Sequence, residues 1–284
     1  MSVIVTECPR DAMQGIHEFI PTEKKIAYIN KLIEAGFPII DFGSYVSPKA
    51  IPQMADTDKV LDGLKLNDKT KLLAIIANER GAEAACKRPE ISFLGYPFSV
   101  SETFQQRNTN ASIEQSLTRL EAIKNLSDKA GKDLVVYLSM AFGNPYGDAW
   151  HPDIVTQWAD TLYQKLEIKY LAPSDTIGSA DEKSITDLFK TMIAEMPNVE
   201  IGAHLHATPS DVKNKARWAY EAGCRKFDGA LKGFGGCPMA KDDLTGNMDT
   251  EQMLSYFREI KLDLGINDQH LSDAIAMLPE VFPL

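Results

Sequence analysis

The chain has 284 residues, of which 44% are hydrophobic and 25% are charged, as in an ordinary globular protein. No run of about 18 apolar residues occurs in it, so a helix that spans a membrane is not expected. Its 40 acidic residues outnumber 30 basic ones, giving a net charge of −10 without a basic block, so nucleic-acid binding is not expected as the main function.

Short apolar runs rich in β-branched residues recur along the whole chain and predict eight strands. They lie near residues 3–7, 39–42, 72–76, 91–95, 134–138, 170–172, 200–206 and 226–230. Segments with helical periodicity separate them. One begins at Pro21 and ends at Gly36, and others cover 112–130 and 211–222, each followed by a glycine. Further helices are expected from about Thr250 onward.

The alternation of strands and helices predicts the fold class α/β, with a parallel sheet covered by helices. Eight such units in 284 residues fit a closed TIM (β/α)8 barrel better than an open, doubly wound sheet. The glycine fingerprints of phosphate- and dinucleotide-binding sheets are absent after the first strand, which also disfavours the open sheet. No linker divides the chain, so we expect residues 1–284 to form a single barrel domain with additional C-terminal helices.

The seventh predicted strand ends in two histidines at alternate positions, His204-Leu205-His206. In a barrel of this kind the chemistry is built at the carboxyl ends of the strands. Because alternate residues of a strand point to the same face, the two imidazoles project side by side. This arrangement predicts a metal site, and the alternative is a pair of hydrogen-bonded polar side chains that bind no ligand.

Oxygen ligands stand near the ends of neighbouring strands. Asp11 follows the first strand, and Asn247 follows the last one. With His204 and His206 they would complete a mixed nitrogen and oxygen ligand set. Such a set, which has no thiolate, suits Mg²⁺ or Mn²⁺, with Zn²⁺ as the alternative.

Three more charged residues occupy strand ends and are candidates for active-site roles, namely Arg10, Asp41 and Asp175. Arg10 adjoins Asp11, so its planar fork of donors is suited to hold a carboxylate or to stabilise an enolate oxygen. The alternative is a surface arginine paired with an acidic neighbour. Asp41 and Asp175 are suited to fix metal ligands, or equally to cap the helices that follow them.

The four cysteines form no Cys-x-x-Cys pair, which is typical of reduced thiols in a cytoplasmic protein. The N-terminal sequence carries neither a secretory signal nor an Arg-rich transit peptide, and this leads to the same expectation. Cys237 differs from the others because Gly233, Gly235 and Gly236 precede it and Pro238 follows it. A thiol in such a loop is a candidate acid or base, the alternative being a small packing residue.

Taken together, these residues resemble the 3-hydroxy-3-methylglutaryl-CoA lyase family of the DRE-TIM metallolyase superfamily, almost from end to end. The segments that carry the resemblance are 9–14 (PRDAMQ), 44–49 (SYVSPK), 52–54 (PQM), 112–116 (SIEQS), 175–178 (DTIG), 204–206 (HLH) and 235–238 (GGCP). The SYVSPK and GGCP segments favour the lyase branch over the isopropylmalate and homocitrate synthases.

The resemblance implies a TIM barrel that uses a divalent cation to cleave 3-hydroxy-3-methylglutaryl-CoA into acetyl-CoA and acetoacetate, a reaction of leucine degradation. It implies that Arg10 stabilises the enolate of the thioester product and that Cys237 is a catalytic acid or base. It also implies supporting active-site roles for Asp41 and Asp175, an acyl-CoA as the small-molecule partner, and a homodimer. The metal ligands that it implies are Asp11, His204, His206 and Asn247.

The chain departs from the family pattern at several positions, although the implied ligand set is intact. Asp41 stands where a glutamate, one methylene longer, is usual. The other departures are Ala12-Met13 for Gly-Leu, Ala172 for a serine, Ala207 for an acidic or amide residue, and ten positions rather than nine from Cys237 to Asn247.

Retro-Claisen cleavage breaks the bond between a tertiary carbinol carbon and the CH₂ next to the thioester. A base must take the hydroxyl proton, and His206 and Asp41 are both candidates. A Lewis-acid cation and Arg10 would stabilise the charge that develops, and Cys237 would protonate the enolate carbon. The alternatives are a Claisen-condensing acyl-CoA synthase of the isopropylmalate or homocitrate type, a metal-dependent 4-hydroxy-2-oxo acid aldolase, and a barrel that only binds.

Overall fold

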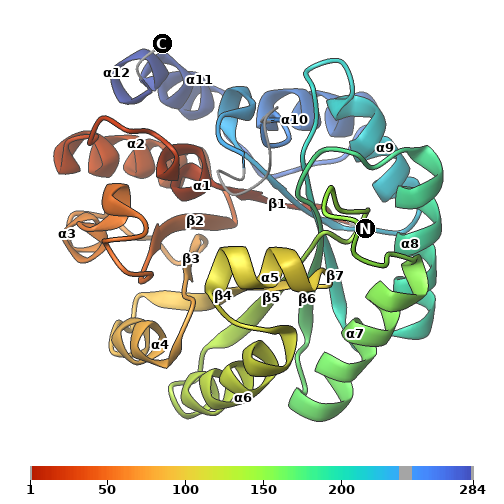
Figure 1. Ribbon diagram of the computed structural model, residues 1–284. Coiled ribbons are helices and arrows are strands. Elements are labelled where there is room, and N and C mark those ends of the chain that lie inside the picture. Colours follow the sequence, from red (N-terminus) through yellow and green to blue (C-terminus); the bar gives the residue numbers. More distant parts are fainter. Residues whose placement is uncertain (1, 237–244, 283–284) are drawn as a thin grey trace.

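Eight parallel strands form a closed barrel in the order of the sequence, so the fold predicted from the chain, a TIM (β/α)8 barrel, is confirmed. The computed structural model describes residues 2–236 and 245–282. Figure 1 shows the strands at the centre and the helices around them. The strands are β1 Ile4–Glu7, β2 Ile39–Ser44, β3 Lys71–Ile75, β4 Ile91–Ser99, β5 Asp133–Ser139, β6 Tyr170–Asp175, β7 Glu200–Leu205 and β8 Lys226–Gly229.

Helices follow the strands around the outside of the barrel. No helix of the described segments is both long enough and apolar enough to cross a membrane. The α-helices are α1 Pro9–Gln14, α2 Thr22–Ala35, α3 Thr57–Asp62, α4 Glu79–Cys86, α5 Glu102–Thr109, α6 Ile113–Lys129, α7 Pro152–Leu166, α8 Glu182–Glu195, α9 Val212–Glu221, α10 Thr250–Glu259, α11 Asp268–Ala276 and α12 Leu278–Val281. Two short 3-10 helices are η1 Pro52–Met54 and η2 Leu231–Gly233.

The element boundaries differ from those predicted mainly near the carboxyl ends of the strands. Strand β4 continues to Ser99, and β6 continues to Asp175, whereas β7 ends one residue before His206. Helix α1 was not predicted, because its six residues are too few for helical periodicity to be recognised. It begins directly after β1, with a proline at its first position, where the missing N–H costs no hydrogen bond.

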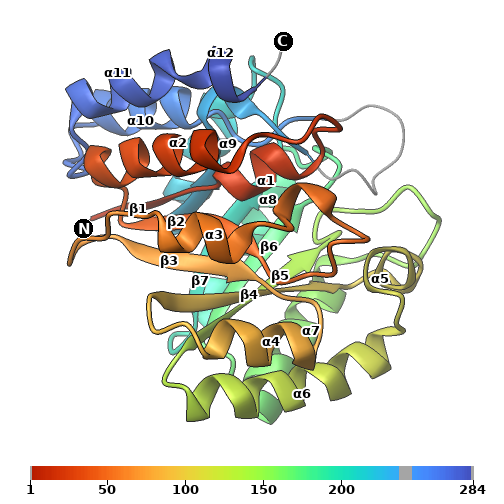
Figure 2. The ribbon, with the colours of Figure 1, turned by 90° about the vertical axis from the view of Figure 1, so that its left-hand side faces the viewer.

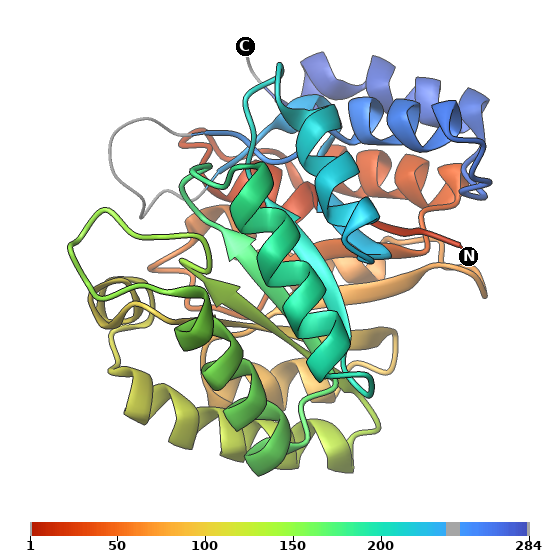
Figure 3. The same cartoon turned by 90° about the vertical axis from the view of Figure 1, so that its right-hand side faces the viewer.

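Apolar packing fills both the inside of the barrel and the space between the strands and the helices. The inner cluster includes Leu73, Phe93 and Tyr137, which close the barrel interior. The additional C-terminal helices predicted from the sequence are present, and Figure 2 shows α11 and α12 beside α2. The rings of Tyr28 in α2 and Phe282 lie 5.8 Å apart, edge to face. Helices α7, α8 and α9 cover another flank, in green to cyan in Figure 3.

A buried carboxyl group, Glu7 at the end of β1, joins the first strand to the last part of the fold. Its Oε1 accepts a hydrogen bond from the Leu231 N–H at 2.8 Å, and its Oε2 accepts one from the Thr250 hydroxyl at 2.6 Å. Burial raises the pKa of Glu7 to about 8, because the two hydrogen bonds offset the loss of hydration only in part. The carboxyl is therefore protonated in the folded chain at neutral pH.

We predict that Glu7 makes the folded state less stable as the pH rises from about 5 to about 8. In that window the unfolded carboxyl is ionised and the folded one is protonated, so folding takes up a proton and each pH unit costs up to about 1.4 kcal/mol. Glu7→Gln imitates the protonated form. Urea unfolding should show equal stability of the two proteins near pH 5 and a more stable variant at pH 8. A constant difference across this range would contradict the raised pKa of Glu7.

Candidate functional site

A cavity of about 150 Å³ lies at the carboxyl ends of the strands and is lined by four of the eight residues that the sequence nominated, namely Arg10, Asp11, His204 and His206. Its lining contains polar and apolar side chains, and Asn108 also lines it. The polar residues are Arg10, Asp11, Gln14, Ser139, Ser174, Thr176, His204 and His206. The apolar wall consists of Val46, Ile51, Ile75, Ala77, Pro97, Phe104 and Tyr137.

Helix α1 holds Arg10 and Asp11 at the edge of this cavity, and both residues are buried. The guanidinium of Arg10 donates from Nε and Nη2 to Asp41 and from Nη1 to Asp11 at 2.8 Å. Nη1 also donates to Gln14 Oε1 at 3.0 Å. A guanidinium has five N–H donors, so one N–H of Nη2 has no partner among the described residues. Arg10 is thus a fixed cation with one donor left for a ligand.

The histidines His204 and His206 line the cavity from the end of β7, as the alternation of strand residues predicts. The Nδ1 atom of His204 lies 3.1 Å from a carboxylate oxygen of Asp228 on β8. The Nδ1 atom of His206 lies 3.1 Å from the carbonyl oxygen of Thr176. These contacts place the protons on Nδ1 and leave Nε2 of each ring as the basic atom.

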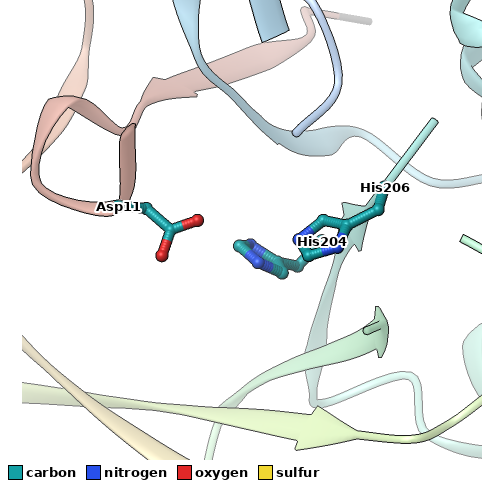
Figure 4. A group of neighbouring side chains, drawn as sticks. All are labelled: Asp11, His204 and His206. Carbon is teal, nitrogen blue, oxygen red and sulfur yellow. The ribbon is translucent and has the colours of Figure 1, made fainter. Parts of the chain in front are cut away.

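The carboxylate of Asp11 faces the two imidazoles (Figure 4). Ligand atoms of Asp11, His204 and His206 all lie within 4.8 Å of one another. Within the described segments, the buried Nε2 atom of His206 has no hydrogen-bond partner, which is costly unless a ligand binds it. A carboxylate and the Nε2 atoms of two imidazoles around one point are suited to a divalent cation.

The fourth nominated ligand, Asn247, reaches the same place from the far end of the chain. Its Nδ2 donates to Asp11 Oδ2 at 2.8 Å and to the Phe234 carbonyl at 2.8 Å, so its Oδ1 is the atom left for a cation. His206 and Asn247 also form an antiparallel backbone bridge. Gly235, at φ +94°, packs so closely against Asn247 and the main chain of Asp11 that a Cβ there would lie 2.7 Å from the Asn247 amide nitrogen.

Electrostatics hold Asp11 and His206 in the protonation states that a cation requires, and make the ring of His204 more basic. Burial would raise the pKa of Asp11, but Arg10 and the two histidines outweigh it, so this pKa is lowered and the group is ionised. Burial lowers the pKa of His206 to about 4, with the charge of His204 adding to the effect, so its ring is neutral. Burial also acts on His204, but the hydrogen bond to Asp228 outweighs it and raises the pKa of that ring.

Besides Asn247, which contacts Asp11 but does not itself line the cavity, three nominated residues do not line the cavity or cannot be placed there. Asp41 is buried behind Arg10, and its carboxylate accepts hydrogen bonds from the guanidinium. Asp175 is buried behind His206, where Lys215 donates to its Oδ2 at 2.7 Å. It caps no helix, because the N-cap of α8 is Asp181. Cys237 lies outside the described residues.

Sequence reasoning missed three residues that hold the site together, namely Gln14, Asp228 and Lys215. Gln14 donates to Asp11 Oδ1 at 2.6 Å, from one helical turn away. Asp228 was predictable, because the alternation along β8 puts it on the inner face, opposite the outward Phe227. Lys215 could have been recognised from its place on the apolar face of the helix, because a buried charge there needs a buried partner.

Comparisons with known proteins agree with this geometry over almost the whole chain. The HMGL-like family model matches residues 3–278. The cytoplasmic 3-hydroxy-3-methylglutaryl-CoA lyase of Danio rerio is 33% identical over 266 residues, which cover 93% of this chain and 78% of that protein.

Two solved structures are similar to the whole barrel. An HMG-CoA lyase from Acinetobacter baumannii, in complex with coenzyme A and 3-methylmalate, has a TM-score of 0.91 at 29% identity, covering 99% of this chain and 91% of that one. The HMG-CoA lyase of Bacillus subtilis has a TM-score of 0.91 at 30% identity, covering 98% and 93%.

Proposed function

This chain belongs to the HMGL-like family, and we propose that its cavity cleaves 3-hydroxy-3-methylglutaryl-CoA into acetyl-CoA and acetoacetate. The chain is a carbon–carbon lyase of the hydroxymethylglutaryl-CoA lyase type, since a relative of that name aligns with 93% of it. The observation that carries the proposal is the meeting of Asp11, His204 and His206 in the cavity that Arg10 also lines.

We propose that Asp11, His204, His206 and Asn247 hold the divalent cation that this family uses. Its identity is proposed as Mg²⁺ or Mn²⁺, because two oxygen donors and two imidazoles without a thiolate suit these ions. When bound, the cation would supply Lewis-acid chemistry that acidifies the substrate hydroxyl. The unpartnered Nε2 of His206 and the lowered pKa of Asp11 support this ligand set.

Arg10 is proposed to stabilise the enolate oxygen that develops on the thioester as the carbon–carbon bond breaks. Its orientation is fixed by Asp41 and Asp11, so the remaining N–H needs no reorganisation to meet the developing charge. One such donor is worth roughly 3 kcal/mol of transition-state stabilisation. The apolar side chains that line the same cavity are proposed to shield the reacting carbon from water.

The base that takes the hydroxyl proton is proposed to be neither of the two candidates that the sequence offered. If His206 binds the cation through Nε2, its Nδ1 is occupied by the Thr176 carbonyl, and no basic atom is left. Asp41 is bonded to the guanidinium of Arg10 and does not line the cavity. Both aspartates, Asp41 and Asp175, are proposed as supporting residues that orient Arg10 and the strand ends.

The cellular setting is also proposed. We infer a cytoplasmic homodimer in leucine degradation from the family resemblance, although curated relatives carry both cytoplasmic and mitochondrial names. Light scattering of the purified chain should give the mass of two copies, and the mass of one copy would overturn the homodimer.

Acetoacetate release tests the function directly. With Mg²⁺, the wild-type protein should release acetoacetate and acetyl-CoA from 3-hydroxy-3-methylglutaryl-CoA, and His204→Ala should not, with an unchanged circular dichroism spectrum as the control for folding. Consumption of acetyl-CoA with a panel of 2-oxo acids, without acetoacetate release, would instead identify a condensing synthase. Cleavage of a 4-hydroxy-2-oxo acid alone would identify an aldolase.

Arg10→Lys should separate transition-state stabilisation from ground-state binding. Lysine keeps the charge but cannot span Asp41, Asp11 and a substrate oxygen at once. Steady-state kinetics should therefore show kcat lower by roughly 100-fold or more with little change in KM. A raised KM at unchanged kcat would mean that Arg10 binds substrate and transition state alike.

Cys237 is proposed as the acid that protonates the enolate carbon. The support for this role is that Gly235, two positions before it in the chain, packs against Asp11 and Asn247. Cys237→Ser should lower kcat strongly and change the free energy of unfolding by less than about 1 kcal/mol. A large loss of stability with full turnover would show a packing residue instead.

A further inference from the structure

Helix α9 carries a buried lysine, Lys215, whose ammonium group donates hydrogen bonds to other residues of the protein. It is 3% exposed and lies on the same helix face as Val212, Ala216 and Ala219. Its hydrocarbon part therefore lies in apolar surroundings, and its ammonium group ends beside the polar strand ends. Lys215 does not line the cavity, so it cannot contact a substrate there.

The ammonium group of Lys215 donates to three acceptors, which matches its three N–H groups. It lies 2.8 Å from the carbonyl oxygen of His206, 2.7 Å from Asp175 Oδ2 and 3.0 Å from the carbonyl oxygen of Gly178. These acceptors belong to the end of β7 and to the turn that follows β6. One side chain thus joins two neighbouring strand ends.

Both of the strand ends that Lys215 joins act on the same imidazole. The first bond fixes the main chain of His206 itself. The other two fix the turn from Asp175 to Gly178, and this turn carries the Thr176 carbonyl that accepts from the His206 ring at 3.1 Å. The position of the His206 backbone and the rotation of its ring therefore depend on one ammonium group.

The same turn also meets the segment that carries Asn247. Gly178 has φ +72° and packs so closely on Thr245 that a Cβ would lie 2.7 Å from a Thr245 methyl carbon. On the other side of this segment, the Ala207 N–H donates to the Gly246 carbonyl at 3.0 Å. A displacement of the turn would therefore reach Asn247 as well as His206.

We propose that Lys215 is a positioning residue that sets the affinity of the site for its divalent cation. It does so by fixing His206 and the turn that orients the ring of His206. The inference rests on the proposed ligand roles of His206 and Asn247. Asp175 supplies the charge that makes a buried ammonium tolerable at this place.

Mn²⁺ binding to the full chain, followed by electron paramagnetic resonance of the free ion, tests the proposal without an activity measurement. Lys215→Met should weaken Mn²⁺ binding by about 10- to 100-fold, the usual effect of losing a residue that orients a ligand. Because this variant leaves Asp175 buried without its partner, the double variant Asp175→Asn/Lys215→Met is measured too. Removing both charges should restore the melting temperature towards wild type and leave Mn²⁺ binding weak.

Two further proteins complete the comparison. Asp175→Asn alone keeps the lysine and its two carbonyl acceptors, so it should bind Mn²⁺ more tightly than either protein without the lysine. The matched control is Lys25→Met/Asp56→Asn, because Lys25 is also buried and bonded to an aspartate and to the Gln53 carbonyl, away from the cavity. It should bind Mn²⁺ like wild type.

Recovery of wild-type Mn²⁺ affinity in Asp175→Asn/Lys215→Met would overturn the proposal, because Lys215 would then be half of an ordinary buried ion pair. Equal weakening in Asp175→Asn alone would also overturn it, and would assign the effect to the carboxylate. A wild-type chain that binds no Mn²⁺ or Mg²⁺ would overturn the metal site and this inference with it.

Discussion

The carboxylate of Asp11 is the group on which the arrangement of the site depends. Its Oδ1 accepts from Arg10 and Gln14, and its Oδ2 accepts from Asn247, 236 positions away in the chain. Closure of the barrel makes this possible, because β1 pairs with β8 and so brings the first and last strands side by side. Burial opposes the charge of this carboxylate, but Arg10, the two histidines and the Asn247 hydrogen bond lower its pKa, and it faces the two imidazoles (Figure 4).

Buried charges around the cavity occur in pairs, and the pairs divide the aspartates into two kinds. Asp41 balances Arg10, and Asp175 balances Lys215, so both carboxylates lie one layer behind the cavity. Of the three aspartates Asp11, Asp41 and Asp175, Asp11 is the one whose carboxylate lies within 4.8 Å of the ligand atoms of the two imidazoles. A buried ion without a partner would be costly, so each side chain that faces the cavity needs a support behind it. The arrangement therefore uses more charged residues to hold the site than to do its chemistry.

Alternation along a strand was enough to predict that His204 and His206 share one face, and the barrel rule put that face at the carboxyl end. The orientation of Asp175 was missed because the predicted strand stopped at residue 172, whereas β6 continues to Asp175, which lies opposite the outward Leu205 and so points away from the cavity. The role of Lys215 was not predicted, because a lysine on a helix is usually solvated and its partners Asp175 and Gly178 are 40 and 37 positions away in the sequence. Helix α1 was not predicted, because a helix of six residues is too short for helical periodicity to be recognised.

Anomalous diffraction from a crystal grown with Mn²⁺ tests the central claim most directly, since it locates the ion without any assumption about turnover. The account predicts one strong manganese peak at the carboxyl end of the barrel, bonded to a carboxylate oxygen of Asp11, to Nε2 of His204 and His206, and to Oδ1 of Asn247. A manganese peak bonded to a different set of side chains, or no peak in this cavity at saturating Mn²⁺, would contradict it.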